Sequence, residues 1–387
     1  MKVPAAYGNT ARWQLTAQQA VSYAVLPKAG LVVTLSGTDQ TSLLTAREAG
    51  TGKVRWVSKP VKGLGEAYAP RLMVVSAGGK EFVVLWSTGK SGGDALTKAQ
   101  QIYSIDVFAA EGSGQDAVPA QHLEIPMPSG GRHEVLDGGG GKLLLDSVTD
   151  KVTVIDAATG AQQTVEPKSL TAPTGCLQCN GPVVAMTGKG PVVSNSLDAT
   201  RFWSPAGWDN TTVAPPEADP AQAAVWPVAG GQLLARWQEK DQGSHNVWAV
   251  LDGESGQVKA SVLCDKPLIG TGGAPASALS PNGRYLVSEH LAFDLTAKKG
   301  YCFEETKSSK PLTFTVVTDD GTAYGTSLTK DGGIGGSKAP VQLSLATGTA
   351  QALDGVDGVP VADLAGVGVF KVASVSEGGL VAYPRKG

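Results

Sequence analysis

Apolar residues in this chain come in short alternating runs, and small polar turns rich in glycine separate the runs. The segments KVTVIDA (151–157), NVWAVLDG (246–253) and VQLSLATG (341–348) show the pattern clearly. Alternation over four to eight residues predicts β-strands with one buried face. Long stretches with the three-and-four-residue spacing of an amphipathic helix are hard to find. We therefore expect an all-β chain.

One unit recurs along the sequence: an apolar strand, a polar turn that closes on glycine, and a second strand. The first copy is TAREAGTGKVRWVSKP (45–60). Successive turn glycines are 44 to 60 residues apart, which is the length of a four-stranded propeller blade. These glycines are Gly52, Gly112, Gly160, Gly207, Gly256, Gly300 and Gly348.

The repeat predicts a single β-propeller domain over residues 1–387, with eight four-stranded antiparallel blades. The last copy supplies only three strands, and the N-terminal strand at 8–16 is expected to complete it, which closes the ring and removes exposed sheet edges. An open solenoid of hairpins is the alternative. The expected blades span about 20–60, 66–126, 131–168, 180–214, 222–264, 273–305, 311–354, and 358–387 plus 8–16.

The first turn carries a recognisable spacing, Ala46-x-Glu48-x-x-Thr51-Gly52-x-x-x-Trp56. It resembles the Ala-x-Asp-x-x-Thr-Gly-x-x-x-Trp repeat of PQQ-like, quinoprotein-type β-propellers. The resemblance implies an eight-bladed propeller in which the Trp packs between neighbouring blades. Most copies are degenerate, and LSPNGRYLVSE (279–289) looks more like the Ser-Pro-Asp-Gly-Arg turn of other, WD40-like bacterial propellers.

The resemblance also bears on catalysis and cofactors. Quinoprotein dehydrogenases of the family are longer, place an adjacent cysteine pair under the cofactor and hold a calcium ion. This chain has no Cys-Cys dipeptide, so we expect no cofactor. The length is closer to the non-enzymatic bacterial branch, which includes periplasmic scaffolds of outer-membrane assembly and extracellular sensor domains of kinases.

Composition and charge narrow the partners. With 42% hydrophobic residues, the 387-residue chain can bury a large core, and its net charge of −3 gives no basic field for nucleic acid. No apolar run is long enough to span a bilayer, and the N-terminus does not look like a signal peptide. The chain is either cytosolic or lacks its targeting segment. We expect a monomer outside the cytoplasm, tethered to the membrane through a segment on its N-terminal side.

The four cysteines suggest disulfides. Cys176 and Cys179 form a C-x-x-C pair in the predicted connection between the third and fourth blades, where a disulfide would pin a long loop. Free thiols, or a redox or metal role, are the alternatives. Cys264 is expected to end one outer strand and Cys302 to begin the next, so a bond between them is compatible with neighbouring blades, although the predicted heights differ. Disulfides would indicate an oxidising compartment.

Predicted loops give candidate recognition surfaces. In a blade, the innermost strand starts on the face that carries the connections between blades, which we call the top face. The longest predicted top loops are 87–101, 238–245 and 328–340. Loops on a rigid scaffold are the usual place for recognition, and the alternative is that these Gly-rich turns are only mobile.

Polar and aromatic residues at the top of the predicted inner strands are expected to point toward an axial funnel. Such a funnel could hold a small polar ligand or a peptide, whereas ion pairing in water and packing between blades are the alternatives. The candidate ligand-binding residues are Tyr68, Arg71, Arg132, His133, Glu134, Trp226 and Asp363.

Metal and catalytic motifs are not evident. The four histidines, His122, His133, His245 and His290, have neither His-x-His nor His-Glu-x-x-His spacing, so no metal site is expected. We expect a non-catalytic recognition, sensor or scaffold domain that binds a protein or cell-envelope partner through its top-face loops. The alternative is a propeller enzyme of the lyase or glycosidase type with its site in the axial funnel.

Overall fold

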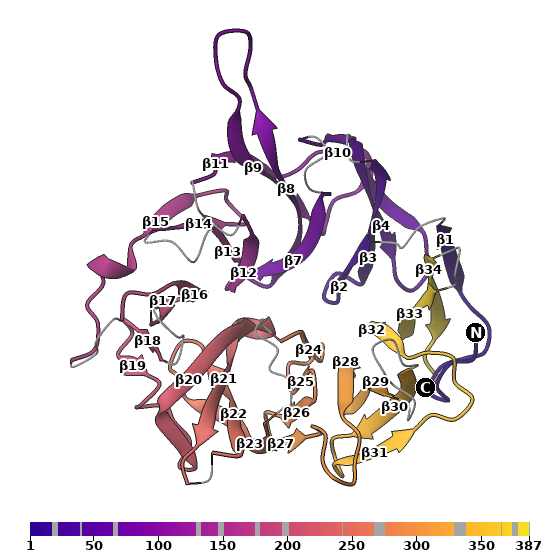
Figure 1. Ribbon diagram of the computed structural model, residues 1–387. Helices are drawn as coiled ribbons and strands as arrows, with labels where there is room; N and C mark the ends of the chain where they lie inside the picture. The colour runs from indigo at the N-terminus through magenta and orange to yellow at the C-terminus, as the bar shows by residue number, and fades with distance from the viewer. Residues whose placement is uncertain are drawn as a thin grey trace. The chain divides into compact units, whose positions relative to one another are not determined.

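The computed structural model describes residues 1–17, 22–38, 41–64, 69–128, 133–145, 151–174, 179–195, 201–241, 243–266, 275–328, 338–364, 366–373 and 378–386. Throughout these ranges the regular structure is β-strand, apart from two single-turn 3-10 helices, η1 (Pro167–Ser169) and η2 (Ala229–Gly231). The prediction of an all-β chain is confirmed (Figure 1). Within the described ranges, no helix has the length and apolar character needed to cross a membrane.

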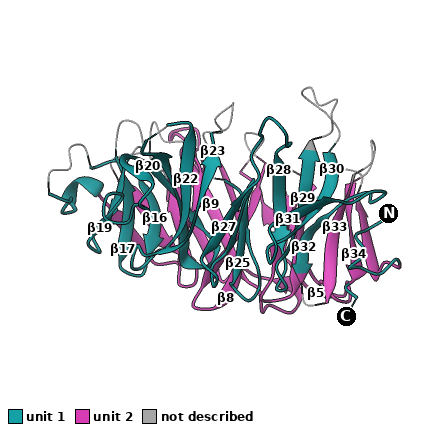
Figure 2. Cartoon of the chain, turned by 90° about the horizontal axis from the view of Figure 1, so that it is seen from below, with its two compact units in different colours: residues 1–9, 167–363, 385–387 teal, residues 10–166, 364–384 magenta. Residues whose placement is uncertain are grey.

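The chain divides into two compact units, which Figure 2 shows in different colours. Unit 1 comprises residues 1–9, 167–363 and 385–387, and unit 2 comprises residues 10–166 and 364–384. Each unit therefore combines segments that are far apart in the sequence.

The first three sheets of unit 2 are each formed mainly by strands that are consecutive in the sequence. The order β5-β4-β3-β2 forms the first sheet, to which β10 and β6 add short pairings, and β11-β9-β8-β7 and β12-β13-β14-β15 follow. The bounds are β2 (Ser22–Leu26), β3 (Leu31–Thr38), β4 (Thr41–Glu48), β5 (Val54–Ser58), β6 (Val61–Lys62), β7 (Arg71–Ala77), β8 (Lys80–Ser91), β9 (Gln100–Ala109), β10 (Gly114–Ala117), β11 (Gln121–Pro126), β12 (Val135–Gly139), β13 (Lys142–Leu145), β14 (Val152–Asp156) and β15 (Gln162–Val165).

Another sheet brings the two ends of the sequence together. Its order is β1-β34-β33-β32, with β1 (Trp13–Ala17), β32 (Pro360–Leu364), β33 (Val367–Ala373) and β34 (Gly378–Pro384). β1 pairs with β34 in antiparallel register from Trp13↔Ala382 to Ala17↔Gly378. The N-terminal strand thus supplies the fourth strand of a sheet whose other three strands come from the C-terminal end.

Unit 1 contains further meanders of four strands, β16 to β19, β20 to β23, β24 to β27 and β28 to β31. One parallel contact, Ser261↔Lys299, links the second and third of these meanders. The bounds are β16 (Val183–Thr187), β17 (Gly190–Ser194), β18 (Phe202–Ser204), β19 (Trp208–Asp209), β20 (Ala218–Val228), β21 (Gln232–Glu239), β22 (His245–Asp252), β23 (Val258–Asp265), β24 (Ser277–Leu279), β25 (Tyr285–Ser288), β26 (Leu291–Asp294), β27 (Lys299–Cys302), β28 (Leu312–Val317), β29 (Thr322–Leu328), β30 (Lys338–Ser344) and β31 (Thr349–Ala352).

Buried side chains pack between successive sheets within each unit. In unit 2, Val75 and Val84 on one sheet share a cluster with Leu143 and Ile155 on the next. In unit 1, Leu234 packs in the same cluster as Phe293 of the following sheet. Successive four-stranded antiparallel meanders with apolar side chains between them are the construction of β-propeller blades. The chain is therefore built from propeller-type blades.

The turns of the repeat also hold neighbouring sheets together. Trp56 is 1% exposed, and its Nε1 donates to the Ala110 carbonyl of the next sheet at 3.4 Å. Gly52 has a positive φ of 71°, and a Cβ on it would come within 2.5 Å of the Trp13 ring. Only glycine fits this close approach. Trp56 thus makes the contact between sheets that the family resemblance implied.

Candidate functional site

The structure brings three of the funnel candidates together in unit 2. Arg71 is the first residue of β7, and His133 and Glu134 directly precede β12. All three line a cavity of 130 Å³, where the Arg71 guanidinium lies 5.2 Å from the centre of the Trp86 ring. The other two candidates from this part of the chain, Tyr68 and Arg132, lie outside the described residues.

Trp226 belongs to unit 1 and has a packing environment of its own. It lies near the C-terminal end of β20 and stacks on Trp248 at 5.9 Å, with the Arg236 guanidinium 5.5 Å from its ring centre. Its predicted place at the start of a strand is wrong, because β20 begins at Ala218 and turns into β21 only after Val228.

Asp363 also lies at the end of its strand, β32, rather than at the start, so its predicted position is wrong too. Its carboxylate accepts a hydrogen bond from the Tyr7 hydroxyl at 2.6 Å and one from Arg385 Nη1 at 2.8 Å. Arg385 Nη2 also reaches Asp320, at 2.6 Å. Burial raises the pKa of Asp363, and burial beside Asp363 raises the pKa of Tyr7 strongly. Asp363 therefore anchors Tyr7 and Arg385 near the two ends of the chain.

The β8–β9 hairpin contains the predicted top loop 87–101. β7 pairs with β8 only as far as Arg71↔Trp86, whereas the β8–β9 ladder continues to Ser91↔Gln100. Its end consequently projects beyond β7 and β11 (Figure 1). The loop predicted at 87–101 is strand at both ends, so only residues 92–99 form the connection.

The tip of this hairpin has a defined turn. Asp94 Oδ1 accepts hydrogen bonds from the backbone N–H groups of Leu96 and Thr97, each at 2.7 Å, and from the Thr97 hydroxyl at 2.8 Å. These bonds lower the pKa of Asp94 and hold its charged form. Leu96 is 96% exposed as a result. An ordered turn thus presents a large apolar side chain to solvent.

A cavity of 620 Å³, here called the hairpin cleft, lies at the base of the same hairpin. Its lining comes from β8, β9, β11 and the two segments 59–64 and 118–119. The polar groups are Lys59, Lys62, Lys90, Asp106, His122 and Glu124, and Val61, Leu64, Val118 and Pro119 add apolar surface.

Three lysines and two carboxylates, Asp106 and Glu124, line the hairpin cleft. Lys59, Lys62 and Lys90 form no ion pair with any residue in the described ranges. The Asp106 carboxylate, by contrast, is 3% exposed and lies 2.7 Å from His122 Nδ1. Burial raises the pKa of Asp106, and the His122 hydrogen bond opposes that rise. The cleft therefore offers three unpaired ammonium groups to an acidic ligand.

Sequence patterns missed the lysines of this cleft. Lys59 and Lys62 belong to the short segment VSKPVKG, in which β6 pairs with β4 of one sheet. Lys90 lies on β8 of the next sheet. No local motif connects these positions, and only the pairing of the strands brings them together. The predicted loop STGKSGGDALTKAQQ, which contains Lys90, was the one available signal.

Of the other two predicted top loops, the one at 238–245 ends in a histidine that contacts two carboxylates. His245 lies between Glu239 and Asp265, with Nδ1 and Nε2 each 2.8 Å from a carboxylate oxygen. Most of the 328–340 loop lies outside the described residues. Among the residues described, no group of three or more His, Cys, Asp or Glu side chains could hold a metal ion.

The three cysteines that the structure describes, Cys179, Cys264 and Cys302, are disulfide-bonded. A disulfide joins Cys264 and Cys302, with the two Cα atoms 5.5 Å apart. The expected difference in height is wrong, because β23 and β27 run parallel and each cysteine lies near the end of its strand. Cys179 is also disulfide-bonded, whereas Cys176, its expected partner, lies outside the described residues.

Comparison with known proteins gives weak similarities only. No family model and no curated protein matches the chain. Among solved structures, the RRP9 WD40 repeats align with a TM-score of 0.42 and 11% identity, covering 100% of this chain and 99% of that one. BamB from Moraxella catarrhalis gives 0.38 and 14%, covering 100% and 94%. The uncharacterized protein lmo1340 from Listeria monocytogenes EGD-e gives 0.36 and 8%, covering 90% and 82%. The fold assignment rests on the sheets and turns of this chain itself.

Proposed function

We propose that this protein is a non-catalytic recognition domain, and that a protein partner binds at the hairpin cleft and the tip of the β8–β9 hairpin. The observation that carries the proposal is that one hairpin has at its tip Leu96, which follows the Asp94 turn and is exposed, and contributes Lys90 to a cleft with three unpaired lysines. An exposed apolar residue on the same element as a charged cleft is typical of a binding surface.

The chemistry of the site defines the partner. Leu96 would fill an apolar pocket on the partner, and the ammonium groups of Lys59, Lys62 and Lys90 would face acidic side chains. Charge complementarity of this kind raises the association rate and selects the partner, whereas the apolar anchor supplies most of the affinity. We infer that the partner presents an apolar pocket with an acidic rim.

The proposal includes an architecture and a location. We infer a monomeric eight-bladed propeller in which β1 completes the last blade, and the pairing of β1 with β34 supports this. We also infer that the domain works outside the cytoplasm, tethered to the membrane on its N-terminal side. The oxidised cysteines support an oxidising compartment, because disulfides rarely persist in the cytosol.

Photo-crosslinking tests the proposed binding surface directly. A benzophenone amino acid replaces Leu96 in the cells that make the protein, and adducts are identified after irradiation. Position 96 should give one dominant protein adduct. Matched probes at Leu136 and Leu263, which are 41% and 43% exposed, serve as controls. The same adduct at all three positions, or none at position 96, would contradict the proposal.

A further inference from the structure

A second cavity, of 540 Å³, lies in unit 1 on one face of the β28–β31 sheet. We call it the Glu304 cavity. Cross-strand pairs such as Leu312↔Ser327 and Val341↔Ala352 put their members on the same face of this sheet, and that face forms the floor. The segment from Cys302 to Leu312 supplies the opposite wall.

Small side chains account for the space. Between the β24–β27 strands and the β28–β31 sheet, Tyr285, Phe314 and Leu343 belong to one buried cluster. Phe303 contacts Phe314 edge-on, with 5.3 Å between the ring centres. The floor of the cavity carries Ala339, Ala350 and Ala352 instead. Residues this short cannot reach the opposite wall, so an apolar cleft of ligand size remains.

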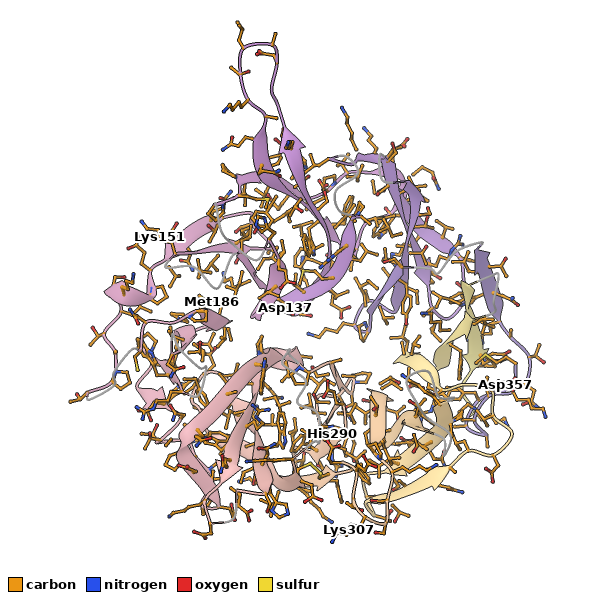
Figure 3. The ribbon with its side chains drawn as sticks, viewed as in Figure 1. Asp137, Lys151, Met186, His290, Lys307 and Asp357 are labelled. Carbon is orange, nitrogen blue, oxygen red and sulfur yellow. A yellow bond between two sulfur atoms is a disulfide. The ribbon has the colours of Figure 1, made fainter. Side chains whose placement is uncertain are left out.

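The wall of the cavity is fixed in place before any ligand binds. The Phe303 N–H donates to the His290 carbonyl at 2.8 Å, and the Leu312 N–H donates to the Phe303 carbonyl at 2.9 Å. The disulfide at Cys302 ties the same segment to β23. In Figure 3, Lys307 of this segment lies near the lower edge of the view and His290 lies further in. A preformed site loses little conformational entropy when it binds.

One carboxylate in this cavity, that of Glu304, keeps acceptor positions free for a ligand. The Glu304 side chain is 11% exposed and accepts a hydrogen bond from the backbone N–H of Glu305 at 3.1 Å. His290 Nε2 lies 3.1 Å from Glu304 Oε2, yet that nitrogen has no partner in hydrogen-bonding geometry. A carboxylate offers about four acceptor positions, so beside these two neighbours Glu304 can still accept a hydrogen bond from a ligand donor.

Asp265 and Lys310 are the other charged residues that line the cavity. Asp265 lies 2.8 Å from His245 Nε2, and its side chain is 42% exposed, so water screens its charge more than that of Glu304. Lys310 lines the cavity and forms no ion pair within the described part of the chain. Its ammonium group is available to a ligand carbonyl, while Glu304 is available to a ligand cation.

We propose that the Glu304 cavity binds the amino terminus of an apolar peptide. The terminal ammonium donates to the Glu304 carboxylate, the first apolar side chain lies on the alanine floor, and the first peptide carbonyl accepts from Lys310. A free apolar amine shares the ammonium and the apolar body, and the experiment separates these two sources. The site does not depend on the proposed partner at the hairpin cleft.

Calorimetric titration of the full chain tests the proposal with defined probes. They are the dipeptide amide Leu-Leu-NH2, its N-acetylated form and n-hexylamine. We expect the free dipeptide amide to bind at least 10-fold more tightly than its acetylated form, because only the free form carries the ammonium. Tighter binding of hexylamine than of the dipeptide would assign the site to free amines and overturn the peptide assignment. Equal binding of the acetylated and free dipeptides would overturn the role of Glu304.

Two variants localise the binding. Glu304→Gln should weaken the dipeptide about 10-fold, whereas Glu305→Gln, an exposed neighbour outside the lining, should leave it unchanged. Ala350→Leu should abolish binding by filling the floor while the thermal midpoint changes little. Equal losses in Glu304→Gln and Glu305→Gln, unchanged binding in Ala350→Leu, or no heat from any probe at millimolar concentration would contradict the proposal.

Discussion

At the residue scale, several junctions between neighbouring sheets share one contact, in which an outer-strand aromatic side chain lies on a turn glycine of the next sheet. Trp13 Nε1 donates to the Ala49 carbonyl at 2.7 Å beside Gly52. The Tyr301 hydroxyl donates to the Leu345 carbonyl at 2.7 Å, and its ring occupies the space where a Cβ on Gly348 would lie. The glycine is therefore needed for its conformation and for the space above it.

Substitution of Gly52 tests this contact. Gly52→Ala should lower the free energy of unfolding by about 2 to 4 kcal/mol, since the positive φ costs about 1 kcal/mol and the methyl group displaces Trp13. Gly30 has a similar φ of 64° but open space around it, so Gly30→Ala should cost only about 1 kcal/mol. Urea denaturation measures both values. Equal losses in the two variants would contradict the packing role of Trp13.

A buried aspartate provides a pH-dependent prediction. Arg284 Nη2 donates to Asp294 Oδ2 at 2.7 Å, and this bond lowers the pKa of the Asp294 carboxyl below its unfolded value near 3.8. A carboxyl with a lowered folded pKa adds stability above its unfolded pKa and loses it as the pH falls through the folded pKa. Asp294→Asn should cost about 1 to 2 kcal/mol at pH 7, with a difference from wild type that stays nearly full down to about pH 4 and shrinks as the pH falls further toward the folded pKa of Asp294. A constant difference from pH 7 to pH 2.5, measured by urea denaturation, would rule out this origin.

At the scale of elements, a disulfide joins the outer strands of two adjacent sheets. Cys264 is the second-last residue of β23, and Cys302 is the last residue of β27. The two strands run parallel, so the two cysteines lie side by side. The bond closes a loop with a sequence separation of 38 residues. It therefore limits the unfolded chain and also fixes one wall of the Glu304 cavity.

Removal of this disulfide should destabilise the protein measurably. The double variant Cys264→Ala/Cys302→Ala should lose about 2 to 4 kcal/mol of unfolding free energy, as expected for a loop of this length. Denaturation of the oxidised wild-type protein under the same conditions provides the reference. A loss below about 0.5 kcal/mol would show that the bond does not constrain the unfolded chain.

Strand pattern and turn chemistry made the elements predictable, whereas the sites depend on contacts between sheets. Alternation and the turn glycines identified the strands, and Trp56 identified the packing between sheets. The lysines of the hairpin cleft come from two sheets, so no local spacing reveals them. Trp226 and Asp363 were misplaced because the bounds of their strands depend on pairing with the next strand. The Glu304 cavity results from small residues, which leave no signal in a hydrophobic pattern.

At the scale of the whole molecule, the segment before β1 connects to residues near the C-terminal end. Tyr7 is fully buried and donates to Asp363, and Arg385 binds Asp363 from the other end of the chain. Lys2 N also donates to Asp357 Oδ2 at 2.6 Å. These contacts hold the N-terminal segment in unit 1.

Loss of the Tyr7 hydroxyl should weaken this attachment. Tyr7→Phe should lower the unfolding free energy by about 1 to 2 kcal/mol, because a buried carboxylate loses a donor. Tyr23→Phe is the control, since the Tyr23 hydroxyl has no hydrogen-bond partner within the described part of the chain. Equal effects of the two changes on urea denaturation would show that the Asp363 contact adds nothing.

As a whole molecule, the protein is proposed to recognise a protein partner through the β8–β9 hairpin. Ser91 and Gln100 face each other at the end of the ladder, so an Asn-Gly turn can replace residues 92–99 without disturbing the strands below. The measurement is the dissociation constant of the partner identified by crosslinking, for wild type and for this shortened hairpin. We predict a loss of at least 30-fold with an unchanged thermal midpoint. A dissociation constant within 2-fold of wild type would contradict the account.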